Sequence, residues 1–208
     1  MKKIDLKNYA KKSENSLKFI IPSWDQIYNL LLELAKMIQK SGFEPDIIVG
    51  VCRGGWIPAR ILSDLLDNQK LANITVEFYE GICETKPNPV ITQQVSVSVN
   101  NRKVLVVDDV ADTGKSLKLV NLHLKKKGAS EIKIATIYYK PWSSIVPHYY
   151  KQETMGWIIF PWERKEATKK MVEKFTNMGI NIEYFKENLI SFGLNKKLTE
   201  RFIKELGE

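Results

Sequence analysis

The sequence feature that most constrains the fold is the stretch Val104–Ser116, which reads VLVVDDVADTGKS. Its first four residues are branched and apolar, as in a strand that is buried on both faces of a parallel sheet. Two carboxylates follow at the expected end of the strand, and a short turn, Asp112–Gly114, comes next. Ser116 begins an amphipathic segment that predicts a helix. The stretch therefore predicts an α/β fold with a strand–turn–helix unit at its centre.

This unit also predicts a site for an anionic ligand that carries hydroxyl groups. Backbone N–H groups of the turn and of the helix N-terminus point outward, and the helix dipole favours a phosphate there. The carboxylates of Asp108 and Asp109 suit a neighbouring diol or a Mg²⁺ ion, because both bind carboxylate oxygens. A phosphorylated sugar together with a metal ion meets all of these conditions.

Two phosphate-binding families have features in common with this stretch. Gly114–Ser116 looks like the end of a P-loop, but the first glycine of that motif would fall at Asp109, which excludes a P-loop nucleoside triphosphatase. The order of four apolar residues, two acids and a D-x-G-x-[ST]-like turn resembles the signature of the type I phosphoribosyltransferases, which bind phosphoribosyl pyrophosphate (PRPP). The resemblance implies a mostly parallel central sheet flanked by helices, with a small hood. The apolar spacing of the tail, where the chain departs from the family, predicts a helical C-terminal extension in addition.

The same resemblance implies a role for each residue of the signature. Asp108 and Asp109 would hold the ribose hydroxyls, and Asp109 would also reach Mg²⁺. Asp112 would be the catalytic residue, which faces purine N7 and takes or balances the proton of the base. The residues implied to bind PRPP and its ribose phosphate are Asp108, Asp109, Asp112, Thr113, Gly114, Lys115 and Ser116.

A second glycine-rich turn comes earlier in the chain. The predicted strand Ile47–Val51 runs into Cys52–Gly55, and a helix is expected after it. Such a turn predicts another anion site, to which Arg53 adds a positive charge. The stretch resembles the pyrophosphate-binding loop of the same family. This implies that Arg53 and Gly54 bind pyrophosphate, and that the peptide bond between residues 52 and 53 is cis.

Two further segments resemble base-binding parts of the family. Tyr139–Trp142 is expected at the tip of a strand, and Lys140 matches a lysine that donates to purine O6 in relatives that use 6-oxopurines. The stretch WIIFPWE at 157–163 resembles the hood of the xanthine-guanine branch, which implies stacking by Trp157 and backbone contact at Ile158. These features favour hypoxanthine, guanine or xanthine. A hood rebuilt by the C-terminal tail leaves adenine open as the alternative base.

Composition limits the class of protein. The chain has 208 residues, 44% of them hydrophobic, which suits one phosphoribosyltransferase domain (1–163, with the hood at about 141–163) and a helical extension (164–208). No apolar run approaches the roughly 18 residues of a membrane span, so no membrane partner is expected. We expect no secretory signal, and the two cysteines form neither a disulfide framework nor a metal cluster. These features predict a cytoplasmic enzyme.

The charge leaves an alternative of another class open. The net charge of +8 allows an RNA-binding regulator on the same fold that senses PRPP or nucleotides. Lysine and glutamate are interspersed without an arginine-rich run, and the acids of the signature are intact, so we expect no nucleic acid partner. The predicted function is purine salvage: a purine base and PRPP give a nucleoside monophosphate and pyrophosphate. Mg²⁺ is the expected cofactor, and the family resemblance suggests a homodimer.

The remaining pattern predicts the other elements. Apolar residues at helical spacing predict a helix from Ser23 to about Lys40, and strands are expected at Ile74–Tyr79 and Ile132–Tyr138. A flexible loop is expected at about 80–89, where the family carries a mobile active-site loop. Valines that alternate with serines predict a half-exposed strand over 95–99. A further helix is expected over 165–179, followed by short helices.

Overall fold

The computed structural model describes residues 19–79, 88–177, 186–187, 190 and 193–206. The chain divides into two compact units, Asp25–Thr154 and Met1–Trp24 with Met155–Glu208. The predicted boundary between residues 163 and 164 stays a prediction. The predictions for the N-terminal arm up to residue 18 and for the loop at 80–87 lie outside the described residues.

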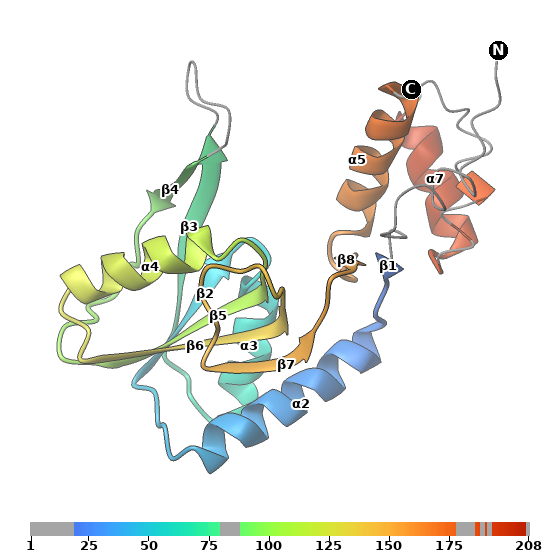
Figure 1. The fold of residues 1–208 in the computed structure, drawn as a ribbon. Coiled ribbons are helices and arrows are strands. Elements are labelled where there is room, and N and C mark those ends of the chain that lie inside the picture. The colour runs from blue at the N-terminus through green and yellow to red at the C-terminus, as the bar shows by residue number, and fades with distance from the viewer. Residues whose placement is uncertain (1–18, 80–87, 178–185, 188–189, 191–192, 207–208) are drawn as a thin grey trace. The chain divides into compact units, whose positions relative to one another are not determined.

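A six-stranded sheet forms the centre of the unit Asp25–Thr154 (Figure 1). The strands follow the order β4-β3-β2-β5-β6-β7, and only the pair β3–β4 is antiparallel. Their bounds are β2 Ile47–Cys52, β3 Leu71–Tyr79, β4 Asn88–Gln93, β5 Lys103–Ala111, β6 Glu131–Tyr139 and β7 Tyr149–Glu153. The predicted α/β fold with a mostly parallel sheet is confirmed.

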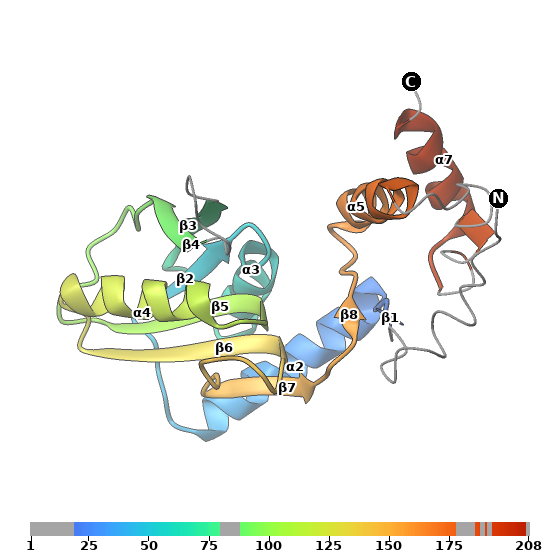
Figure 2. The same ribbon diagram turned by 45° about the horizontal axis from the view of Figure 1, so that its top comes forward.

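The connections place two strand ends side by side. Helix α3 (Trp56–Leu65) joins β2 to β3, whereas α4 (Lys115–Lys126) joins β5 to β6 in the opposite direction along the sheet. Right-handed crossovers that run in opposite directions put their helices on opposite faces of the sheet, as Figures 1 and 2 show. Strands β2 and β5 are hydrogen-bonded neighbours at this reversal. Ligands of open α/β sheets bind at such a switch point, beyond the carboxyl ends of the strands.

The apolar run of β5 is the centre of the core. Its residues Val104–Val107 are fully buried. Val104 and Val106 pack in one cluster with the apolar face of α4, as expected for a strand whose side chains alternate between two covered faces. Helix α2 (Trp24–Lys40) buries residues at helical spacing, which are Ile27, Leu31, Leu34, Ala35 and Ile38.

Removing a core side chain from β5 is expected to cost far more stability than removing an exposed one. Leu105 is fully buried, and Leu105→Ala should lower the free energy of unfolding by about 2–5 kcal/mol, because the cavity it leaves closes only in part. Leu122 on α4 is 56% exposed, and Leu122→Ala should change it by less than about 0.5 kcal/mol. Urea unfolding of both variants checks this, and equal losses would contradict the assignment of the core.

Three sequence predictions differ from the structure. Strand β5 does not end before the two acids but continues to Ala111, because β6 offers pairing partners that far, whereas pairing with β2 ends at Val107. The segment 95–99 is not a strand: β4 already pairs with β3 at this edge. Its three alternating valines do not share one buried face: Val99 is buried in the core, whereas Val97 is 43% exposed. The edge strand β7 was not predicted.

The other unit holds short strands and helices. Strand β1 (Phe19–Ile20) pairs in parallel with β8 (Trp157–Ile158), and helix α5 (Arg164–Asn177) contacts α7 (Lys196–Leu206). A small apolar core forms from Ile159, Ala167, Met171 and Leu194. The prediction of a helical tail is confirmed for these described helices.

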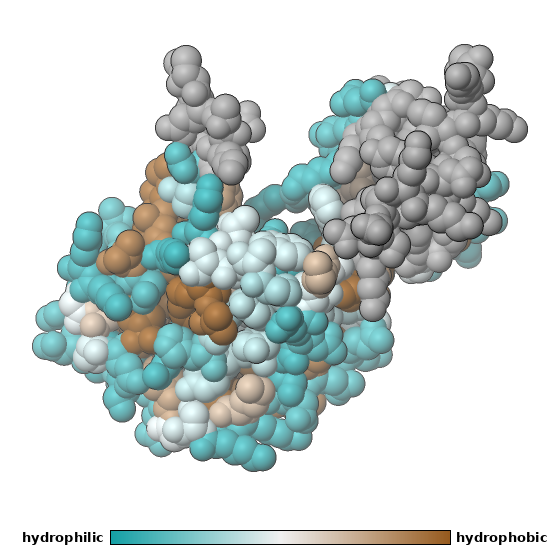
Figure 3. All heavy atoms as spheres, viewed as in Figure 1, coloured by the Kyte–Doolittle hydropathy of each residue, from teal (hydrophilic) through white to brown (hydrophobic). Residues whose placement is uncertain are grey.

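The surface and the helices bear on the membrane prediction. Within the described residues, every helix is too short or too polar to cross a bilayer. Apolar and hydrophilic residues are mixed on the face of the Asp25–Thr154 unit that Figure 3 shows.

Candidate active site

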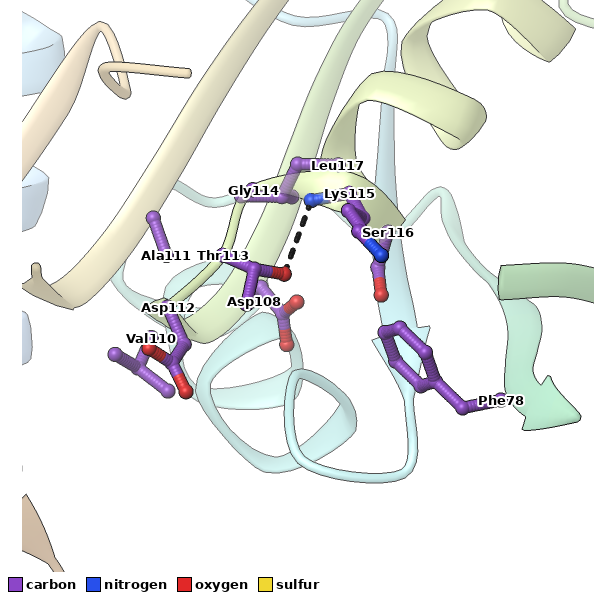
Figure 4. A pocket seen from close by; sticks show the side chains of 10 residues that line it. All are labelled: Phe78, Asp108, Val110, Ala111, Asp112, Thr113, Gly114, Lys115, Ser116 and Leu117. Carbon is purple, nitrogen blue, oxygen red and sulfur yellow. Dashed lines mark hydrogen bonds between the residues drawn. The ribbon is translucent and has the colours of Figure 1, made fainter. Parts of the chain in front are cut away.

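A cavity of about 420 Å³ opens where β5 ends and α4 begins (Figure 4). Its lining residues are Phe78, Asp108, Val110, Ala111, Asp112, Thr113, Gly114, Lys115, Ser116 and Leu117. The structure thus brings together all the residues that the signature predicts for PRPP, except Asp109. Asp109 does not line this cavity and is only 9% exposed.

The turn after β5 has the geometry of an anion site. Gly114 adopts a left-handed conformation with φ +76°, which glycine reaches without strain. Helix α4 starts directly after it, and among the described residues no side chain caps the helix at this glycine. The N–H of Lys115 donates weakly to Oγ1 of Thr113 at 3.4 Å (Figure 4). A helix N-terminus of this kind suits an anionic ligand.

The glycine-rich turn after β2 packs directly against the two acids. A Cβ added to Gly54 would overlap the carboxylate of Asp109, so the loop backbone lies against this side chain. A Cβ on Gly55 would lie 2.7 Å from Val51 O and 2.8 Å from Asp108 Cα. The peptide bond between residues 52 and 53 is cis, as the resemblance implies. The two predicted anion-binding turns therefore meet at the acid pair.

The predicted base-recognition lysine lies beside the predicted catalytic acid. Lys140 follows β6, is 6% exposed, and its backbone N–H donates to Ala111 O at 3.0 Å. Burial lowers the pKa of Lys140 below its ordinary value, and the nearby carboxylate of Asp112 opposes only part of this shift. Oδ1 of Asp112 accepts a hydrogen bond from Nε1 of Trp142 at 2.9 Å. A cationic donor thus lies near the carboxylate of Asp112, which lines the cavity.

Comparison with known proteins decides the family. The Phosphoribosyl transferase domain family matches residues 23–168, which include both turns and the acid pair. The chain belongs to this family. The xanthine-guanine phosphoribosyltransferase of Cereibacter sphaeroides is 32% identical over 148 residues, which cover 68% of this chain and 84% of the relative.

Two further proteins to which this phosphoribosyltransferase is similar are also named as purine phosphoribosyltransferases. The hypoxanthine-guanine phosphoribosyltransferase of Streptococcus pneumoniae is 31% identical over 137 residues, or 64% of this chain and 75% of that protein. The crystal structure of a purine phosphoribosyltransferase from Pyrococcus horikoshii matches with a TM-score of 0.64 and 43% identity. It covers 70% of this chain and 94% of its own. The type I phosphoribosyltransferase fold is confirmed.

The hood residues lie in the other compact unit of this phosphoribosyltransferase. Trp157 on β8 is 45% exposed, whereas its neighbour Ile158 is 7% exposed. An exposed indole is free to stack on a flat ligand, and a buried isoleucine can offer only its backbone. Their approach to Lys140 stays a prediction.

The acid pair of the phosphoribosyltransferase has the character of a cation site. Burial raises the pKa of Asp108 well above its ordinary value, and the adjacent charge of Asp109 raises it further. A divalent cation would offset both effects. The described residues hold no group of three or more His, Cys, Asp or Glu side chains that could bind a metal alone. The donor set therefore fits Mg²⁺ held by one or two carboxylates together with oxygens of the substrate.

Replacing Asp108 is expected to stabilise the ligand-free protein while it removes activity. Between the ordinary and the raised pKa, the native protein keeps a proton that the unfolded chain has released, so the free energy of unfolding falls as pH rises through this range. Asparagine does not titrate, so Asp108→Asn should not lose stability over this pH range. Its side-chain oxygen can still accept the hydrogen bond from the N–H of Asp109, which donates to Asp108 Oδ1 at 3.0 Å. At alkaline pH the free energy of unfolding of the variant should exceed that of the parent by about 0.5–2 kcal/mol.

Unfolding in urea with chelator at about pH 5 and about pH 8, with turnover measured in parallel, checks this expectation. The stability difference between variant and parent should grow with pH. Asp64→Asn on α3, where the aspartate side chain is 67% exposed, serves as the control and should show no such trend. A variant that is less stable than its parent at the higher pH would contradict the interpretation.

Sequence reasoning missed four residues that line the cavity, which are Phe78, Val110, Ala111 and Leu117. It also missed Trp142, which donates a hydrogen bond to Asp112. Phe78 lies near the end of β3 and is 49% exposed, a placement that no motif indicates. Trp142 stands two positions after Lys140, and this proximity to a predicted site residue was the available signal.

Proposed function

We propose that this protein transfers the phosphoribosyl group of PRPP to a purine base and releases pyrophosphate. The observation that carries the proposal is that two turns, one after each of the neighbouring strands β2 and β5, lie at one acid pair, Asp108 and Asp109. A substrate with a phosphate at one end, a pyrophosphate at the other and a diol between them fits this arrangement. The relatives named above act on purines, which supports a purine as acceptor.

Each part of the site has a separate task in the reaction. Backbone N–H groups at Asp112–Ser116 bind the 5′-phosphate, and Arg53 with Gly54 binds the pyrophosphate. Asp108 and Asp109 accept hydrogen bonds from the ribose hydroxyls. Asp109 would hold Mg²⁺, which would neutralise charge on the pyrophosphate.

The chemical step exchanges one bond for another at the anomeric carbon. A purine nitrogen forms a bond to C1 of the ribose as the bond from C1 to the pyrophosphate oxygen breaks, and the electron pair leaves with pyrophosphate. Positive charge develops on the sugar, as in an oxocarbenium ion. Asp112 takes or balances the proton that the base gives up.

We further propose that the base is a 6-oxopurine. The buried ammonium of Lys140 can donate to the carbonyl at purine C6 and offers no acceptor for the amino group of adenine. Trp157 stacks on the purine ring, and the backbone of Ile158 contacts its edge. A cytoplasmic location and a homodimer complete the proposal, and size-exclusion chromatography tests the homodimer.

Pyrophosphate release with PRPP and Mg²⁺, measured separately with adenine, hypoxanthine, guanine and xanthine, tests the function. We expect turnover with 6-oxopurines and at most a trace with adenine. Turnover of adenine alone would overturn the role of Lys140 and leave the transferase intact. PRPP binding without turnover of any base would instead favour a PRPP-sensing regulator, for which RNA binding that weakens steeply with salt would be the sign.

A further inference from the structure

Trp142 is exposed at the surface, yet it makes a directed contact with the site. About half of the side chain, 51%, is exposed, although burying an indole is normally favourable. Its Nε1–H donates to the carboxylate oxygen Oδ1 of Asp112 at 2.9 Å. No hydrogen bond reaches the other oxygen, Oδ2, from any residue that the structure describes. One oxygen of the carboxylate is thus fixed, and the other is open.

The ring of Trp142 also lies against Lys140. The ammonium Nζ stands 5.4 Å from the ring centroid, within the range of a cation–π interaction. One side chain therefore contacts both the acid and the lysine to which we assign the purine. Trp142 fixes the spacing between these two groups, because it touches each of them through a different part of its ring system.

The backbone around Trp142 is bonded to the phosphate turn. Both the N–H and the hydroxyl of Ser144 donate to Thr113 O, at 3.0 Å and 2.8 Å. The N–H of Ser143 donates to Lys140 O at 2.9 Å, which closes a tight turn around Trp142. A Cβ on Gly114 would lie 2.7 Å from Ser143 Oγ, so the two segments are in close contact. The backbone that carries Trp142 is therefore held in place by hydrogen bonds to the phosphate turn and to Lys140.

We propose that Trp142 is a positioning residue, which binds Oδ1 of Asp112 so that Oδ2 faces the purine at a fixed distance from Lys140. This inference rests on the proposed function, because it requires Asp112 to act on the base. Trp142 itself need not touch substrate. Its contribution is to keep one rotamer of Asp112 populated, so that the proton acceptor does not have to be ordered during each turnover.

Two variants separate the hydrogen bond from the ring. Trp142→Phe keeps an aromatic ring but removes the N–H donor, and it should lower kcat by about 10- to 100-fold because a hydrogen bond to a charged group is lost. The KM for PRPP should change by less than about threefold, since the phosphate turn keeps its backbone bonds. Trp142→His places a ring N–H at the equivalent position and should restore most of the turnover.

A double-mutant cycle tests whether Trp142 acts through Asp112. In the Asp112→Asn background, Trp142→Phe should lower kcat no further, because the group that it positions has already been replaced. Trp24→Phe serves as the control, since Trp24 is exposed to the same extent, 51%, and should keep parental turnover. Thermal unfolding of every variant shows whether each remains folded.

Each outcome of this cycle has a defined meaning. A kcat of Trp142→Phe within about twofold of the parent, or full multiplication of the two losses, would overturn the positioning role. A higher KM for the base at unchanged kcat would overturn it too, by assigning the ring to base stacking. In these cases the parent still turns over and the proposed function stands. An inactive parent, in contrast, removes the proposed function and this inference together.

Discussion

Asp112→Asn is expected to lower kcat by about 10²- to 10⁴-fold, the range typical of a lost general acid or base. Asparagine has nearly the same shape and can still accept the Trp142 N–H through its oxygen, so the turn should keep its geometry. The amide cannot take a proton from the base. PRPP affinity should therefore change by less than about threefold, because the contacts to phosphate come from the backbone.

Single-turnover kinetics with direct measurement of PRPP binding distinguishes these effects. Asp64→Asn, which replaces an exposed aspartate on α3, is the matched control and should behave as the parent does. Parental turnover by Asp112→Asn would remove its catalytic role. A parallel loss of PRPP binding would instead assign Asp112 to the phosphate turn as a structural residue.

Gly55→Ala is expected to remove activity and to destabilise the protein by about 1–3 kcal/mol or more, as overpacking does. Gly55 has ordinary dihedral angles, φ −71° and ψ −11°, so alanine meets no conformational strain there. The added Cβ would instead collide with backbone atoms of Val51, Val107 and Asp108. Backbone cannot rotate aside as a side chain can. The pyrophosphate loop and the acid pair must therefore separate.

Gly42→Ala is a control in which backbone conformation, and not steric overlap, causes the loss of stability. Gly42 has φ +71°, which costs an L-residue about 1–2 kcal/mol, but a Cβ there has no heavy atom within 4 Å. The two variants should lose comparable stability, as measured by urea unfolding, yet only Gly55→Ala should lose PRPP binding. Retained PRPP binding in folded Gly55→Ala would show that the loop tolerates the shift.

Much of the site could be predicted because its signals are local. The run Val104–Val107 with its following acids and glycine specifies a buried strand and a phosphate turn without reference to any other segment. The same holds for Cys52–Gly55, where the family resemblance also implied the cis bond that the structure contains. The helices at 24–40 and 115–126 follow from apolar spacing alone.

What could not be predicted depends on tertiary partners. The end of β5 at Ala111 is set by the length of β6, which no pattern within β5 reveals. The segment 95–99 alternates as a strand does, but β4 occupies the edge where it would pair. Phe78 lines the cavity only because of the fold, and no sequence motif indicates its place. For Trp142 the sequence offered one signal, its position two residues after Lys140.

The pairing of β2 with β5 has a consequence for how this activity could be used. These strands lie far apart in the sequence, and each delivers only one of the two anion-binding turns. A fragment with β2 alone or β5 alone holds half a site. If the chain is divided in the mostly exposed segment between β4 and β5, pyrophosphate release should appear only when the two fragments have re-formed one sheet.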